Sequence, residues 1–113
     1  MHEMALAESV VQIVESQARA AGSDKVLTVR LEIGALSHVE PAALAFCFDA
    51  VTAGGIAAGA RLDIDRSPGH GWCHDCMAEV EIAALGAPCP SCGGYRLQLR
   101  EGQEMRVKEM EVA

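Results

Sequence analysis

Four of the five cysteines stand in two Cys-x-x-Cys pairs, which are separated by residues 77–88. A turn of this kind brings two thiolates within reach of one metal ion, and two such turns complete the tetrahedron that Zn²⁺ prefers. The separation is slightly shorter than the roughly 15–20 residues typical of such sites, but only the paired cysteines touch the metal. We therefore predict a zinc site formed by Cys73, Cys76, Cys89 and Cys92.

The predicted zinc site is structural, because four sulfur ligands leave no coordination position open for a reacting water. The same feature argues against a zinc hydrolase, as does the lack of a His-Glu-x-x-His motif, and we expect no enzymatic activity. The alternative for the pairs is redox-active or free thiols, but neither pair opens a helix of a βαβ unit as a thioredoxin-like motif does. Cys47 lies on the apolar face of a predicted helix, which is typical of a small core residue.

Two histidines, His70 and His74, flank or lie inside the first cysteine pair. We interpret them as exposed loop residues. The alternative is that an imidazole replaces a thiolate when conditions change, since neutral histidine binds zinc and titrates near neutral pH.

A second candidate metal site is the start of the chain, Met1-His2-Glu3. The Met1 amine, the His2 amide nitrogen and the nearer ring nitrogen of His2 can form two fused chelate rings. The Glu3 amide or a second imidazole would complete a square of nitrogen donors, which suits Ni(II) or Cu(II) rather than zinc. Two deprotonated amides would cancel the charge of the ion, so that the complex would not oppose the positive end of a helix dipole. The alternative is a frayed terminus with an incidental histidine, because His2 alone is a weak signal.

Charge and composition narrow the class of protein. The net charge is −7, from 9 basic and 16 acidic residues, and residues 70–95 contain no Lys or Arg, which disfavours nucleic acid as a partner. No apolar run approaches the roughly 18 residues of a membrane span, and the first residues lack the basic start of a secretory signal. We therefore expect a cytoplasmic protein, in which paired cysteines favour metal over disulfide.

The apolar spacing predicts two helices. The first covers residues 4–20 and ends at Gly22, and the second begins at Pro41, whose missing N–H costs nothing in a first helical turn. Their predicted apolar faces consist of Leu6, Val10, Ile13, Val14 and Gln17 in the first helix and Leu44, Cys47, Phe48 and Val51 in the second.

Alternating apolar residues predict strands at 25–33, at 60–66 and from 103 onward. In the first strand Leu27, Val29, Leu31 and Ile33 share one face. In the last strand the alternation changes phase between Val107 and Met110, which predicts a β-bulge near Lys108-Glu109.

The order of these elements predicts an α+β fold, with two helices packed on a small three-stranded sheet and a zinc-ribbon module inserted before the last strand. Pro68 and Gly69 mark the entry to the module. We expect a nickel-binding domain over residues 1–66 plus 100–113 and a zinc-binding ribbon over residues 67–99.

Together these residues resemble the HypA/HybF family of hydrogenase nickel-incorporation proteins over essentially the whole chain. The resemblance rests on Met1-His2-Glu3, Ile33–Ser37, Val39-Glu40-Pro41, Phe46-Cys47-Phe48, Gly59–Leu62, the two cysteine pairs, and the closing Gly102–Met105, Val107 and Met110–Val112. The opening motif alone is unspecific, but its combination with the cysteine pairs and the closing strand is highly specific.

The resemblance implies a nickel metallochaperone with separate zinc and nickel domains. It implies that His2 is the essential nickel ligand, that Glu3 contributes through its backbone, and that Glu40 can approach the nickel. It also implies two partners, a nickel-inserting GTPase of the HypB type and the large subunit of [NiFe]-hydrogenase, while some family members also serve urease. Relatives that exchange zinc ligands place a histidine after each cysteine pair, where this chain has Met77 and Gly93.

Two questions stay open at the level of sequence. A zinc-ribbon module that recruits a protein without delivering metal is the alternative to a nickel carrier. The oligomeric state is also open, a homodimer included.

Overall fold

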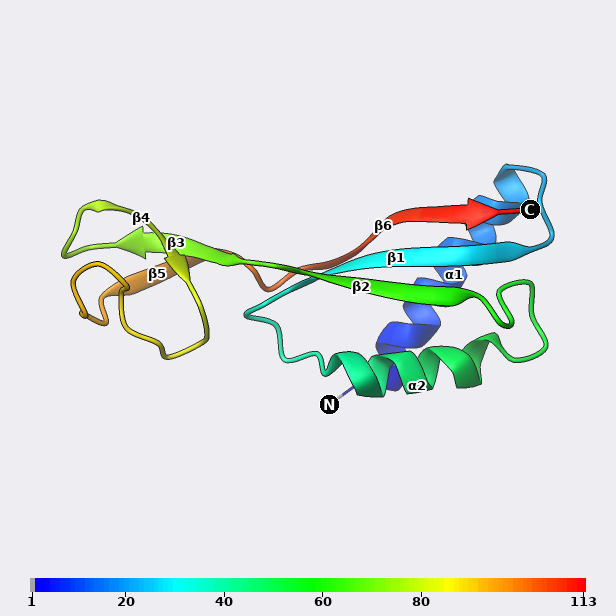
Figure 1. Ribbon diagram of the computed structural model, residues 1–113, viewed down its shortest axis with the longest axis horizontal. Helices are drawn as coiled ribbons and strands as arrows, with labels where there is room; N and C mark the ends of the chain where they lie inside the picture. The colour runs from blue at the N-terminus through cyan, green and yellow to red at the C-terminus, as the bar shows by residue number, and fades with distance from the viewer. Residues whose placement is uncertain (1) are drawn as a thin grey trace. The chain divides into compact units, whose positions relative to one another are not determined.

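The computed structural model describes residues 2–113. The elements follow in the order α1 (Glu3–Ala20), β1 (Val26–Gly34), α2 (Pro41–Thr52), β2 (Arg61–Ser67), β3 (Gly69–Cys73), β4 (Ala78–Ile82), β5 (Leu97–Glu101) and β6 (Met105–Val112) (Figure 1). They divide into two compact units: the chain up to Leu31 with Val39–Asp65 and Arg106–Ala113, and Glu32–His38 with Arg66–Met105. Among the described residues, no helix is long and apolar enough to cross a membrane.

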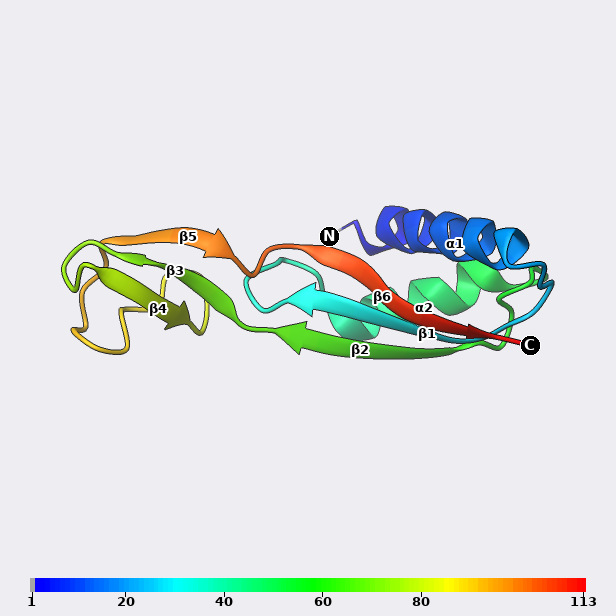
Figure 2. The same ribbon diagram turned by 90° about the horizontal axis from the view of Figure 1, so that it is seen from above.

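The first unit is built on a three-stranded sheet with the order β2-β1-β6. Helices α1 and α2 pack against each other and lie on the same side of this sheet (Figure 2). The side chains of Val29 and Leu31 on β1 are buried together with Val14 of α1 and with Leu44 and Phe48 of α2. The predicted architecture of two helices on a small three-stranded sheet is thus confirmed.

Helix α1 begins one residue earlier than predicted, and its buried face matches the predicted one at Val10 and Val14 only. Its buried residues are Ala7, Val10, Val11, Val14 and Ala18. The prediction was therefore wrong for Ile13 and Gln17, which are exposed. Small side chains allow two helices to approach closely, so the packed face includes the alanines rather than the longest apolar residues.

The end of α1 and the beginning of α2 lie where the sequence predicts. Gly22 has a φ of +76°, and Ser23 N–H donates to the carbonyl of Ala18 at 2.9 Å after the helix ends. Pro41 is the first residue of α2, and the side chain of the N-cap Glu40 accepts from Ala42 N–H at 3.2 Å. A carboxylate at this position satisfies one of the first N–H groups of a helix and complements its dipole.

Strands β1 and β6 show where simple alternation fails. In β1 Val26 is buried and Leu27 is exposed, so the prediction that Leu27 shares the buried face of Val29 was wrong. The strand changes phase near its beginning: after Thr28, the buried residues are Val29, Leu31 and Ile33. In β6 the exposed pair Lys108 and Glu109 separates two runs of opposite phase, as the predicted change between Val107 and Met110 requires.

The second unit contains three strands that the sequence analysis did not identify as strands, in the order β4-β3-β5. Both neighbours of β3 are antiparallel to it, and a bulge lies between His70 and Gly71 opposite β5. Trp72 pairs with Glu79 on one side and with Gln98 on the other. The alternation of Ala78–Ile82 was a usable signal for β4, but the density of Gly, Pro and Cys around it concealed the signal.

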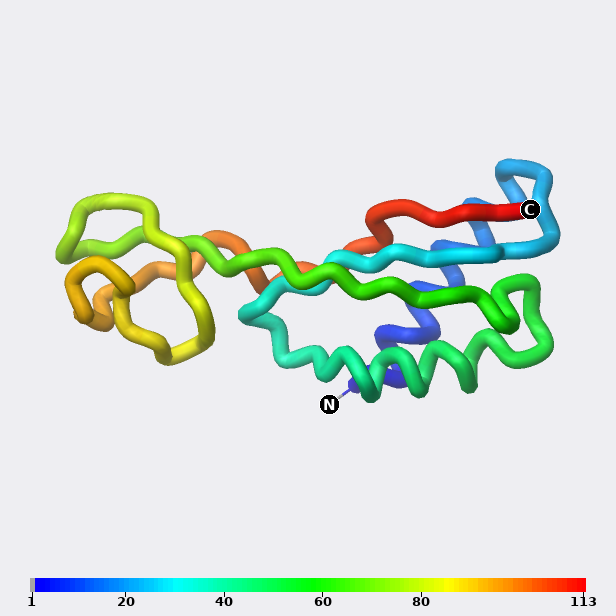
Figure 3. Tube along the Cα trace, viewed as in Figure 1, coloured from blue at the N-terminus to red at the C-terminus, as the bar shows by residue number. Residues whose placement is uncertain are grey.

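Three glycines of the second unit lie where segments distant in the sequence cross. Gly34 N–H donates to the carbonyl of Glu104 and Leu36 N–H to that of Gly102, both at 2.7 Å. A Cβ on Gly34 would overlap the backbone of Gly102, and a Cβ on Gly102 would overlap that of Gly69. The three segments can be followed along the trace in Figure 3. Only residues without a side chain permit this approach.

Candidate metal sites

The four predicted zinc ligands converge in the second unit. Cys73 is the last residue of β3, Cys76 follows in the adjoining turn, and Cys89 and Cys92 lie in the loop before β5. The Sγ atoms of Cys73 and Cys92 are 3.7 Å apart, those of Cys76 and Cys89 are 3.8 Å apart, and all four lie within 4.8 Å of one another. Zn–S bonds of about 2.3 Å in a regular tetrahedron place the sulfurs about 3.8 Å apart. The cluster therefore fits a structural zinc site.

Backbone amides point at the sulfur atoms of both pairs. Cys76 N–H donates to Sγ of Cys73, Ser91 N–H to Sγ of Cys89, and Gly94 N–H to Sγ of Cys92, each at 3.4 Å. Hydrogen bonds to a charged acceptor are the strong ones, so these donors stabilise thiolates. The sulfur separations are far longer than the roughly 2.05 Å of a disulfide bond, and all four thiols are free. Neither pair belongs to a helix, which argues against the thioredoxin-like alternative.

The two cysteine turns each end in a residue with a positive φ. Met77 and Gly93, which follow the second cysteine of each pair, have φ values of +54° and +75°. Among the described residues, Met77 is the only one other than glycine with a positive φ. A left-handed conformation costs an ordinary L-residue about 1 kcal/mol or more. The first turn thus contains a strain that the second turn avoids.

The two turns are also joined to each other. The guanidinium of Arg96 lies 3.0 Å from the carboxylate of Asp75, and the Arg96 carbonyl accepts from His74 N–H at 2.9 Å. A Cβ on Gly94 would lie 2.7 Å from the Asp75 carboxylate, so glycine allows the segment after Cys92 to pass close to the first turn. These contacts hold the two pairs of sulfurs near one point.

Hydrogen bonding gives the thiols of Cys76 and Cys89 different pKa values. The N–H groups of Cys92 and Ser91 lower the pKa of the Cys89 thiol to about 7. Hydrogen bonds to Cys92 and Cys73 raise the pKa of the Cys76 thiol to about 12. A metal that requires four thiolates must therefore displace protons near neutral pH.

The histidines beside the first cysteine turn lie apart from the sulfur cluster. Nδ1 of His70 is 3.8 Å from a carboxylate oxygen of Glu101, and His74 is exposed. Among residues 2–113, the four cysteines are the one group of three or more metal-binding side chains with converging ligand atoms. Cys47 is half-buried on α2 and is not part of that group.

The predicted nickel residues gather at the beginnings of the two helices. His2 is the N-cap of α1 and is exposed, with no hydrogen bond from its side chain to the helix end. Glu3 is the first residue of α1, and its Oε2 accepts from the N–H of Glu40 at 3.2 Å. That N–H lowers the pKa of the Glu3 carboxyl. Met1, the fourth predicted residue, lies outside the described residues.

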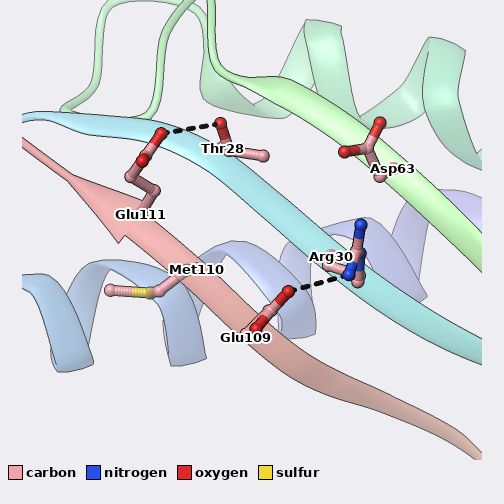
Figure 4. Close-up of a pocket in the computed structure, with 6 residues that line it drawn as sticks. All are labelled: Thr28, Arg30, Asp63, Glu109, Met110 and Glu111. Atoms are coloured by element: carbon pink, nitrogen blue, oxygen red, sulfur yellow. Dashed lines mark hydrogen bonds and ion pairs between the residues drawn. The ribbon is translucent and has the colours of Figure 1, made fainter.

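A further concavity, which the sequence analysis did not predict, lies on the solvent face of the first unit's sheet. It has a volume of about 340 Å³ and is lined by Thr28, Arg30, Asp63, Glu109, Met110 and Glu111 (Figure 4). The guanidinium of Arg30 is 2.9 Å from Glu109 and 3.7 Å from Asp65. These exposed charges neutralise one another across the strands, an arrangement that stabilises cross-strand pairs.

Comparisons with known proteins identify relatives along the full chain. Residues 1–112 match the family model described as hydrogenase/urease nickel incorporation, metallochaperone, hypA. The chain is 55% identical to the hydrogenase maturation factor HypA of Rhodopseudomonas palustris strain TIE-1 and 58% identical to HypA 2 of Bradyrhizobium diazoefficiens. Each comparison extends over 112 residues and covers 99% of both chains.

The fold is also similar to that of solved structures. The solution structure of the Ni metallochaperone HypA from Helicobacter pylori matches with a TM-score of 0.70 at 24% identity, covering 99% of this chain and 97% of that one. This likeness supports the fold, whereas the sequence matches support the relationship. The chain therefore belongs to the HypA family of nickel-incorporating metallochaperones, which act in hydrogenase maturation.

Proposed function

We propose that this protein binds one Ni(II) ion at the start of its chain and passes it on during assembly of [NiFe]-hydrogenase. The proposed donors are the Met1 amine, the amide and ring of His2, and the Glu3 amide, with the Glu40 carboxylate beside them. The zinc bound by Cys73, Cys76, Cys89 and Cys92 would remain in place as a structural ion.

The observation that carries this proposal is the contact between Glu3 and Glu40. The carboxylate of Glu3 accepts the N–H of Glu40 at 3.2 Å, although the two residues are 37 positions apart. His2 immediately precedes Glu3 and has an exposed side chain. The chain start is thereby held beside the first turn of α2 while its imidazole stays accessible to an incoming ion.

The position of these residues in the helix suits amide coordination. The hydrogen-bond ladder of a helix does not use its first N–H groups, so deprotonating the amides of His2 and Glu3 breaks none of its i→i−4 bonds. The two amide charges would balance the 2+ ion at the positive end of the helix dipole. Nitrogen donors in a square suit Ni(II), while tetrahedral sulfur suits zinc, so the two sites select different ions.

Delivery requires partners. Hydrogenase maturation implies contact with the maturation machinery, and we propose that the contacts are a HypB-type nickel-inserting GTPase and the hydrogenase large subunit, with urease as a second recipient. The nickel domain would comprise residues 1–66 with 100–113, and the zinc domain residues 67–99. The proposed location is the cytoplasm, where paired thiolates favour metal over disulfide.

Nickel titration of the zinc-loaded protein tests the proposal. The wild type should bind one Ni(II) with a diamagnetic, square-planar spectrum and no release of zinc, and His2→Ala should abolish this binding. His74→Ala, which removes an exposed histidine of the second unit, is the matched control and should bind nickel normally. Nickel binding by His2→Ala at wild-type affinity, or stoichiometric zinc release, would contradict the proposal and favour the zinc-ribbon interaction module.

A peptide extension before Met1 tests the amine donor separately. The extension converts the amine to an amide but leaves the His2 ring intact. Nickel affinity should fall at least tenfold, which corresponds to about 1.4 kcal/mol, while zinc content stays unchanged. Equal affinities of native and extended proteins would exclude the amine and leave His2 as a ligand.

A further inference from the structure

Strand β6 carries a symmetric pattern along the edge of the first unit's sheet. In the order β2-β1-β6 it is an edge strand, and it follows the outer margin of that sheet in Figure 1. From Met105 to Val112, half-buried and exposed residues follow one another in an order that is the same from either end. The edge of a sheet presents N–H and C=O groups with which another strand can pair. A strand with this symmetry is therefore suited to pair with an identical strand.

The charged residues of β6 have the same symmetry, with opposite signs in the two halves of the strand. Arg106 and Lys108 precede its centre, and Glu109 and Glu111 follow it. If two copies of β6 lie antiparallel about a two-fold axis between residues 108 and 109, Lys108 lies opposite Glu109 of the second copy and Arg106 opposite Glu111. Each pair then occurs twice, because the residues of a two-fold contact exchange roles. Opposite charges at such positions stabilise paired strands, and like charges destabilise them.

The irregularity at the centre of β6 fits the same arrangement. The ammonium of Lys108 lies 3.6 Å from the carboxylate of Asp65, and the carboxylate of Glu109 lies 2.9 Å from the guanidinium of Arg30. Asp65 and Arg30 are themselves 3.7 Å apart, so Lys108 and Glu109 project from the same side of the sheet although they are adjacent in sequence. Such an irregularity interrupts pairing with a regular strand. A second copy has its own irregularity at the matching place, so exposed residues stay opposite exposed ones and half-buried residues opposite half-buried ones.

The charges at the centre of the strand are accessible to a second copy. The side chain of Glu109 is 64% exposed and that of Lys108 is 42% exposed, although each belongs to an ion pair within the chain. Exposed ion pairs contribute little to stability, so they do not prevent a further contact across the strand edge. The net charge of −7 repels a second copy at long range, but physiological salt screens this repulsion beyond roughly 8 Å. The charge pairs within the contact therefore decide whether two copies associate.

We propose that β6 pairs antiparallel with β6 of a second copy of this chain, about a two-fold axis between residues 108 and 109, and so joins the two sheets into one. Backbone hydrogen bonds supply the affinity and the charge pairs select the register. A register shifted by two residues places Glu109 opposite Met110 or Lys108 opposite Val107, and a parallel arrangement places like charges together. Because β6 itself supplies the matching charges, burial order and irregularity, the occupant of this edge is a second copy rather than a different protein.

Sedimentation velocity of the full-length, zinc-loaded protein at physiological salt tests the proposal. The wild type should form a reversible dimer. Lys108→Glu and Glu109→Lys each place two pairs of like charges across the contact, so each should weaken self-association about tenfold or more. In an equimolar mixture of these two variants the charges are again opposite across the contact, and a mixed dimer should form with nearly the wild-type affinity. A variant that fails to fold cannot recover in the mixture, so this result separates a lost contact from a lost fold.

A matched variant and a second measurement locate the contact. Glu8→Lys is the control, because Glu8 is exposed on α1 and its substitution changes the net charge by the same amount as Glu109→Lys. Its self-association should equal that of the wild type. Raising the wild-type concentration should also slow amide hydrogen exchange in β6 and leave it unchanged in β2, the opposite edge of the same sheet.

The contrary outcomes are equally specific. A wild type that stays monomeric at the highest soluble concentration would overturn the inference, as would a mixture of the two charge variants that stays monomeric while the wild type dimerises. Equal weakening by Glu8→Lys would show that only net charge matters. Self-association that both charge variants retain and Tyr95→Ala abolishes would place the contact in the second unit, where Tyr95 is 72% exposed. No nickel is added in these experiments, so their outcome is independent of the proposed function.

Discussion

The Glu3 carboxylate receives the backbone N–H of Glu40 at 3.2 Å. This bond joins the first residue of α1 to the residue that caps α2. Because the side chain of Glu40 is meanwhile occupied by Ala42 N–H, the two glutamates form a short chain of hydrogen bonds across the two helix ends. That chain fixes the position of the residue next to His2.

Glu3→Ala should weaken nickel binding about fivefold, because the chain start must then be ordered during binding at the cost of fixing roughly one more residue. The Glu3 amide remains, so binding should not be abolished. The pKa of Glu3 is lowered by the Glu40 N–H, so this contact persists above the ordinary pKa of glutamate and is lost as the pH falls through the lowered value. Nickel titration of Glu3→Ala against Glu8→Ala checks the prediction, and equal affinities would refute it.

Cys73→Ala or Cys92→Ala should lose zinc and unfold the second unit, because three sulfurs no longer close the tetrahedron and the binding energy of the metal is also folding energy. Cys47→Ala should keep its full zinc content, since Cys47 lies outside the cluster. Metal analysis with circular dichroism distinguishes the variants. Full zinc in Cys73→Ala would exclude the four-sulfur site.

Zinc binding should release protons and weaken in acid. The thiol of Cys76, with its pKa raised to about 12, carries a proton at neutral pH that the metal must displace. Each proton released makes affinity fall about tenfold per pH unit of acidification. Competition against a chelator at pH 6 and pH 8, corrected for the protonation of the chelator, measures this slope. A pH-independent affinity would mean that the cluster is already fully ionised.

Met77→Gly should stabilise the second unit by about 0.5–1 kcal/mol, because glycine removes the strain of a positive φ and the exposed Met77 side chain contributes little packing. Gly93→Ala, at the equivalent place in the other turn, should destabilise it by about 1 kcal/mol. A Cβ on Gly93 meets no atom within 4 Å, so the cost of the substitution comes only from the positive φ of this residue. Denaturant titration of the zinc-loaded variants tests both signs. A Met77→Gly protein no more stable than the wild type would show that the strain is not at Met77.

Gly34→Ala should destabilise the fold by about 3 kcal/mol or more, because the new Cβ overlaps the Gly102 backbone and a backbone cannot move aside cheaply. Gly55→Ala is the control, since its Cβ meets first the flexible carboxylate of Glu15. Thermal unfolding compares the two variants. A Gly34→Ala protein as stable as Gly55→Ala would show that the crossing segments can separate.

Local features were predictable from the sequence. The cysteine spacing identified four ligands that one ion can hold, and Gly22 and Pro41 marked a helix end and a helix start that the structure reproduces. Even the change of phase in the last strand was visible from the spacing of Val107 and Met110. Each of these features depends on residues within a few positions of one another, so the chain itself carries the information.

Only the tertiary structure decided what distant segments do to one another. The burial of Ala7 and Ala18 in place of Ile13 depends on which side of α1 packs against the rest of the first unit. The exposure of Phe46 depends on which side of α2 meets the core. The sequence analysis placed Glu3 and Glu40 just before two separate helices, and their contact exists because the packing brings the two helix ends together. A periodic pattern states which residues share a face, but the direction in which that face points is set by the partner against which it packs.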